Sequence, residues 1–112
     1  MSTHTLSALL FRFPFPGTWG KDLTERVARA IGDEAGLVWK IWLDDRETGH
    51  ISGVYLFEDA AAADRYRERH ARRLAAMGLA GVTADVFPVE SQVSVLTMAA
   101  AALGLGCPSK AA

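Results

Sequence analysis

Apolar residues run almost without interruption through two stretches in the middle of the chain, residues 37–43 and 53–57. The two stretches are separated by a polar segment rich in Asp, Arg, Glu and Gly. This pattern predicts a hairpin with strands over 37–44 and 50–57 and a turn at 45–49. Successive strand side chains point to opposite faces. One face of the first strand should carry Leu37, Trp39, Ile41 and Leu43. The other should carry Val38, Lys40 and Trp42, so both faces hold large apolar groups.

The flanking segments predict two helices and two further strands. An apolar run over 6–13, stopped by the prolines and glycine of 14–17, predicts a strand. A helix is expected from about residue 20 to 31, opened by Thr18 or Trp19, because apolar residues recur there at three-to-four spacing. Asp59 is a good N-cap for a second helix over 60–77. The rest of the sequence predicts a strand over 82–87, a short helix within 91–103 and a flexible tail over 104–112.

The order β-α-β-β-α-β predicts a ferredoxin-like α+β fold, with an antiparallel sheet and both helices on one face. Residues 1–103 should form a single domain, since 112 residues suffice for one core but not for two. The second helix should present an apolar stripe of Ala63, Tyr66, His70, Leu74 and Met77 to the sheet. The other sheet face is also apolar, so we expect a homodimer, in which a second copy covers that face.

Composition narrows the class of protein further. A formal charge of −1 gives no overall attraction to nucleic acid or to an anionic membrane. A single cysteine excludes an intrachain disulfide, and no window approaches the ~18–20 apolar residues of a transmembrane helix. The N-terminus does not have the pattern of a signal peptide. We therefore expect a cytoplasmic protein that binds neither nucleic acid nor membrane.

Several segments in order resemble the YdhR-type monooxygenase family, a branch of the dimeric α+β barrel proteins. The matching features lie in the Pro14–Trp19 loop, the 36–42 block, the 53–57 block with Asp59, residues 69–74, and Val86-Phe87. The resemblance spans roughly residues 6–92. It implies a homodimer whose sheets face each other around a cavity, and oxidation of an aromatic substrate without metal or flavin.

The candidate site combines aromatic side chains with a few polar groups, which suits a flat aromatic or polycyclic, polyketide-like ligand. The expected catalytic residues are His70, Tyr55 and Lys40. The expected substrate-binding residues are Trp39, Trp42, Tyr66, Arg12, Phe13, Trp19 and Asp85. A substrate that itself reduces dioxygen needs a base and donors that stabilise its anion. His70 is suited to be the base, since imidazole titrates near pH 6.5. Tyr55, Lys40 or a tryptophan N–H would hold the oxyanion.

Simpler interpretations exist for each of these residues. His70 would also serve as a core histidine, and Lys40 could extend to the barrel mouth or pair with Asp85. The arginines at 65, 69, 72 and 73 have the pattern of a solvated helix face. The three histidines lack metal-ligand spacing, so we expect no metal, flavin or other cofactor. Two other functions remain open: a non-oxidative cyclase or isomerase, and a ligand-binding protein without catalysis.

Overall fold

The computed structural model describes residues 5–15 and 20–97, apart from the side chains of residues 21 and 23. Its elements follow the predicted order and add a one-turn 3-10 helix, η1, in the hairpin turn. They are β1 (Ser7–Pro14), α1 (Lys21–Gly32), β2 (Leu37–Leu43), η1 (Arg46–Thr48), β3 (His50–Phe57), α2 (Ala60–Ala76), β4 (Thr83–Pro88) and α3 (Ser91–Leu96). The expected openers Thr18 and Trp19 lie outside the described residues, as do 98–103 of the last predicted helix and the tail at 104–112.

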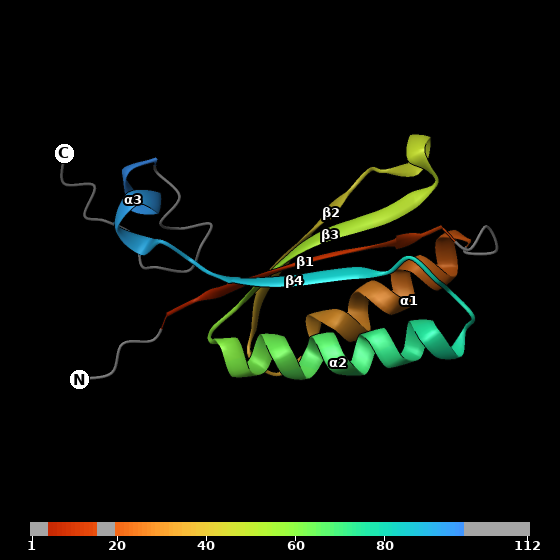
Figure 1. Cartoon of the computed structure of the whole chain (residues 1–112), viewed down its shortest axis with the longest axis horizontal. Helices are drawn as coiled ribbons and strands as arrows, with labels where there is room; N and C mark the ends of the chain where they lie inside the picture. The colour runs from red at the N-terminus through yellow and green to blue at the C-terminus, as the bar shows by residue number, and fades with distance from the viewer. Residues whose placement is uncertain (1–4, 16–19, 98–112) are drawn as a thin grey trace.

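The four strands form one antiparallel sheet in the order β2-β3-β1-β4. Figure 1 shows α1 and α2 side by side under one face of this sheet, while α3 lies beyond its end. This arrangement confirms the predicted ferredoxin-like α+β fold. No helix in the described part of the chain is long and apolar enough to cross a membrane.

Helix α2 covers the sheet because its sequence favours helix and presents one apolar side. The Asp59 carboxylate accepts a hydrogen bond of 2.8 Å from the Ala62 amide, which confirms the predicted N-cap. Tyr66, His70 and Leu74 follow at four-residue spacing and are buried. Met77 differs from the prediction: it is the C-cap residue and is 52% exposed, because the helix ends there.

The core lies between the helices and one face of the sheet. Leu9, Phe11 and Phe13 of β1 alternate with exposed residues, and each is less than 5% exposed. Their partners across β3 are Tyr55, Gly53 and Ile51, so these positions face the helices as well. A side chain at Gly36 would meet Ala62 Cβ at 2.6 Å, and the φ of Gly36 is +82°. Only glycine therefore suits this close approach of β2 to α2.

A β-bulge in β2 corrects one detail of the predicted hairpin. Leu37 pairs with Phe57, but the next pair joins Trp39 to Leu56, so the register shifts at Val38. Leu37 therefore lies on the helix-facing side and packs against the core, not beside Trp39 as regular alternation predicted. Beyond the bulge the predicted alternation holds: Trp39, Ile41 and Leu43 share one face, and Lys40 and Trp42 share the other.

Candidate active site

The candidate active site lies on the helix-facing side of the sheet, where rings from four elements meet. The members are Phe11 and Phe13 of β1, Lys40 and Trp42 of β2, Tyr55 of β3, and Tyr66 and His70 of α2. The rings of Phe11 and Tyr66 make an edge contact, with centroids 6.5 Å apart. Tyr55 and Tyr66 are only 1% exposed. Six of the ten predicted site residues are therefore brought to this side of the sheet, all of these members except Phe11.

Lys40 is the basic group of this cluster, and two aromatic rings enclose its amine. Its Nζ lies 3.2 Å from the Trp42 ring centroid and 4.4 Å from that of Tyr55. Attraction to the ring faces favours the ammonium form. Burial opposes it and lowers the pKa of Lys40 from 10.5 to about 7. At neutral pH a substantial share of Lys40 is therefore a free amine, which accepts a proton.

Gly53 makes this position of Lys40 possible. It lies on β3 opposite Trp42, on the helix-facing side. A Cβ at Gly53 would lie 2.7 Å from Lys40 Cε and 3.4 Å from Nζ, so any side chain there would displace the lysine stem. Gly53 is therefore a positioning residue. From the sequence it could be recognised only as the first residue of an apolar strand pattern.

Tyr55 and Tyr66 form a buried pair with their hydroxyl oxygens 3.2 Å apart. Burial is the main cause that raises the pKa of each phenol, and for Tyr55 the neighbouring Tyr66 raises it further. Both phenols therefore stay protonated at neutral pH. Tyr55 is suited to donate a hydrogen bond to a developing oxyanion rather than to act as a base.

His70 is 7% exposed and packed between rings, with its centroid 4.9 Å from Phe11 and 5.2 Å from Tyr66. The Arg73 guanidinium donates to His70 Nδ1 over 3.2 Å. Burial, then the charges of Arg73, Lys40 and Arg69, lower the pKa of His70 to about 4. The neutral ring therefore carries its proton on Nε2, and its free lone pair already has a donor. In this arrangement His70 is placed to donate a hydrogen bond through Nε2–H rather than to accept a proton.

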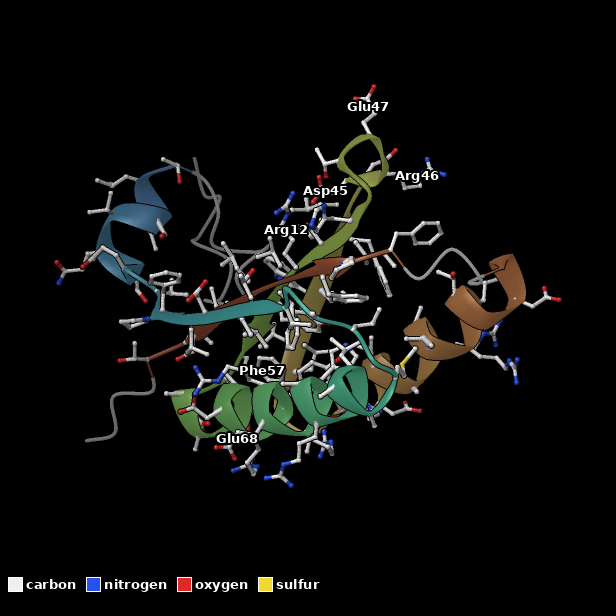
Figure 2. All side chains as sticks on the ribbon, turned by 45° about the vertical axis from the view of Figure 1, so that its right-hand side comes forward. Arg12, Asp45, Arg46, Glu47, Phe57 and Glu68 are labelled. Atoms are coloured by element: carbon white, nitrogen blue, oxygen red, sulfur yellow. The ribbon has the colours of Figure 1, made fainter. Side chains whose placement is uncertain are left out.

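Three other predicted residues have their strand partners on the other face of the sheet, although Trp39, on the edge strand β2, also lines a groove with Lys40 and Trp42. Arg12, Trp39 and Asp85 pair with Ser52, Leu56 and Leu10 respectively, all on the face away from the helices. Figure 2 shows Arg12 and Asp45 on that side, with Phe57 between the sheet and α2. Trp19 lies outside the described residues. The alternative prediction that Lys40 pairs with Asp85 is wrong, because the two residues lie on opposite faces and on opposite edge strands of the sheet.

Arg12 has a structural role that its sequence position did not reveal. Its Nε donates to Asp45 Oδ2 over 2.8 Å, and Ser52 Oγ donates to the same oxygen over 2.6 Å. Hydrogen bonds from Ser52, Thr48 and Arg12 hold the pKa of Asp45 well below its ordinary value. These contacts join β1 to the turn of the hairpin. Trp39, on the same face, has a buried indole N–H with no hydrogen-bond partner among the described residues.

Two arginines of α2 belong to the site, although the sequence pattern placed them with solvated ones. Arg73 contacts His70, and Arg69 pairs with Glu34 while its guanidinium carbon lies 5.8 Å from the Tyr66 ring centroid. Each arginine follows a buried ring by three residues, which places the two on neighbouring positions of one helix surface. The three-residue spacing from each buried ring is the sequence signal that could have identified these two arginines as site residues.

Among the hollows formed by the described residues, three are lined in part by members of the cluster. A cavity of about 520 Å³ lies between the start of α1 and the hairpin, lined by Phe15, Thr24, Trp42, Arg46 and His50 among others. A groove of about 190 Å³ runs between α1 and β2 along Lys40 and Trp42, and a third hollow of about 160 Å³ separates α1 from α2. Trp42 lines both of the first two hollows. Within the described part of the chain, no group of three or more His, Cys, Asp or Glu residues is arranged to hold a metal ion.

With this geometry in view, the comparisons identify the family. A family model described as "Putative mono-oxygenase ydhR" matches residues 8–100, so the chain belongs to this family. The match confirms the resemblance found in the sequence and extends it by a few residues toward the C-terminus.

Two solved structures share the fold. The protein NE2512 from Nitrosomonas europaea, of unknown function, has a TM-score of 0.56 and 16% identity, covering 80% of this chain and 93% of its own. A mutant of SnoaB, a cofactor-independent oxygenase from Streptomyces nogalater, has a TM-score of 0.53 and 18% identity, covering 77% of this chain and 94% of its own. No curated protein sequence matches the chain significantly.

Proposed function

We propose that this protein is a cofactor-independent monooxygenase of small aromatic or polycyclic, polyketide-like substrates. The observation that carries the proposal is Lys40, a buried amine with a pKa of about 7 held against the faces of Trp42 and Tyr55. A base that is partly deprotonated at neutral pH is suited to remove a proton from a phenol or from an activated ring carbon. The family match supports the same reaction class.

The proposed reaction needs no other reductant than the substrate. Lys40 takes a proton from the substrate, and the resulting carbanion or phenolate passes one electron to dioxygen. The substrate radical and superoxide combine into a peroxide anion, which takes a proton. For a ring CH₂ of the anthrone type, loss of water from the hydroperoxide leaves a carbonyl, so one O₂ yields one C=O and one H₂O. Tyr55 and the His70 Nε2–H would donate to the developing anion.

The 520 Å³ cavity and the adjoining groove would hold the substrate. The larger hollow is within the ~300–1,000 Å³ of ordinary ligand sites, and Trp42 forms a wall of both hollows. A flat ring stacked on Trp42 would lie near the Lys40 amine. Trp42 and Phe15 are both partly exposed there, which leaves apolar surface for such a ligand.

We also propose that the chain works as a homodimer, in which the sheet face away from the helices packs on a second copy. Four large apolar side chains on that face are about half exposed: Leu10, Ile41, Leu43 and Phe87, at 44%, 51%, 48% and 52%. Several large, half-exposed apolar side chains on one face are costly to leave in water. A cytoplasmic location belongs to the same proposal and agrees with the single cysteine.

Oxygen uptake tests the proposed reaction. Purified protein and an anthrone or hydroquinone should consume dioxygen above the uncatalysed rate, with chelator present throughout. Product formation under strict anaerobiosis would instead indicate the cyclase or isomerase. Saturable ligand binding without any turnover, across a set of such substrates, would indicate a binding protein.

A further inference from the structure

The hollow between α1 and α2 is not one of the two hollows proposed to hold the oxygenation substrate, although His70 lines it. It measures about 160 Å³. Its apolar wall includes Val27, Ile31 and Leu74, and its polar wall includes Tyr66, His70 and Arg73. An engineered apolar cavity of ~150 Å³ is large enough to bind benzene. The hollow therefore has room for one aromatic ring but not for a polycyclic molecule.

The charges around this hollow favour an anion. Arg69 is paired with Glu34, but Arg73 contacts the neutral His70 imidazole and has no carboxylate partner among the described residues. Arg73, Lys40 and Arg69 all act on His70 as positive charges, and no carboxylate among the described residues offsets them there. Glu34 lines the hollow, but its carboxylate is already paired with Arg69. An arriving anion would therefore meet an unpaired guanidinium at the edge of an apolar pocket.

We propose that this hollow binds a single-ring aromatic carboxylate, with its ring among Val27, Ile31 and Leu74 and its carboxylate on Arg73. The planar guanidinium fits a carboxylate through two parallel hydrogen bonds, and such charge-assisted bonds are stronger than the neutral Arg73–His70 contact. This hollow shares His70 with the proposed oxygenase site, but it is a different cavity from the proposed substrate cavity, and binding there does not depend on catalysis.

Binding of a carboxylate at Arg73 should also change the pKa of His70. A carboxylate beside the ring offsets the positive charges that disfavour imidazolium, so it raises the pKa of His70. The effect is reciprocal: protonation of His70 should tighten carboxylate binding by the same factor. The charged groups that act on His70 are Arg69 and Arg73 of α2 and Lys40 of β2, and Glu34, just after α1, lines the same hollow.

The test is a titration of the full chain with benzoate, followed by NMR of ¹⁵N- and ¹³C-labelled protein. Benzamide, which has the same shape without the charge, is the matched ligand control. We expect saturable shifts in α1 and α2 around the hollow, with a Kd of about 1 mM or tighter. Benzamide should bind at least about tenfold more weakly. Equal affinity for the two ligands, or no saturation by about 10 mM benzoate, would overturn the proposal.

Two further measurements test whether benzoate binds in this hollow. Arg73→Gln should weaken benzoate binding at least about tenfold, whereas Arg72→Gln, at the exposed neighbouring position, should not change it. In the wild-type chain, saturating benzoate should raise the His70 titration midpoint by about half a unit or more. An unchanged midpoint, or full affinity in folded Arg73→Gln, would contradict the assignment. Benzoate is not a substrate of the proposed oxygenation, so failure of either proposal leaves the other standing.

Discussion

Lys40 should make the stability of the protein depend on pH in a way that Lys40→Met removes. Its pKa is about 7 in the folded chain and 10.5 as a free side chain. Between these values the unfolded chain holds a proton that the folded chain lacks, so the free energy of unfolding rises with pH. Below pH 7 both states are protonated and the full cost of burying the ammonium is present. Above pH 10.5 both are neutral and that cost is absent.

The magnitude follows from the same two values. One pKa unit corresponds to about 1.4 kcal/mol, so the interval from 10.5 to about 7 corresponds to at most about 5 kcal/mol. The faces of Trp42 and Tyr55 favour the ammonium by about 1–2 kcal/mol and reduce this difference. We therefore expect wild type to gain about 3 kcal/mol of stability relative to Lys40→Met between pH 6 and 10.

Urea unfolding of both proteins at half-unit pH steps measures this difference. Methionine has a similar length and no charge, so other titrating groups contribute equally to both proteins and cancel. The Met variant should be the more stable protein at pH 6, and the two curves should converge toward pH 10. A stability difference that stays constant over this range would refute a lowered pKa at Lys40.

Three other changes have defined outcomes. Gly53→Ala should push the Lys40 stem off the rings, because the new Cβ would lie 2.7 Å from Lys40 Cε; we expect turnover to fall at least about tenfold and the pH dependence of stability to flatten. His70→Gln should remove a second pH dependence of the same origin, the burial of a group that is charged when protonated. Since the pKa of His70 is about 4, wild type loses up to about 3 kcal/mol as pH falls from 6.5 to 4, and urea unfolding should show the variant without this loss. Ile41→Glu places a charge on the apolar sheet face and should convert a dimer into a monomer in sedimentation equilibrium.

The changes at Gly53 and Ile41 each have a control on the same chain. Gly32→Ala adds a methyl group to open space at an ordinary φ, so it should alter neither turnover nor pH dependence. Arg65→Glu, on the exposed surface of α2, should leave the dimer intact. Wild type that sediments as a monomer at micromolar concentration would contradict the dimer. Folded His70→Gln with full turnover would show that His70 takes no part in the reaction.

The fold could be predicted because the strongest signals in this sequence are local. The apolar runs at 37–43 and 53–57 and the Asp59 cap are each recognised from neighbouring residues, and the structure contains both strands and the cap. The bulge at Val38 could not be predicted, since a register shift depends on pairing with β3 rather than on β2 alone. It is the reason that Leu37 packs in the core.

The site was predicted in its residue types but not in its arrangement. Facing side chains on β2 and β3 follow from alternation, so Lys40, Trp42 and Tyr55 could be grouped from sequence. The separation of Arg12 and Asp85 from that group required the strand register. The Arg73–His70 contact also had to be observed, because an arginine on a helix surface has the same local pattern whether it meets solvent or a buried ring.

The most direct test of the account is the oxygen stoichiometry of an anthrone reaction, measured with wild type and Lys40→Met under chelator. We predict that wild type consumes one O₂ for each carbonyl formed, without added metal or flavin, and stops when oxygen is removed. Lys40→Met should remain folded and turn over roughly 10²–10⁴-fold more slowly, the usual contribution of a general base. Wild-type product formed equally fast without oxygen, or a folded Lys40→Met protein with unchanged turnover, would contradict the proposed function.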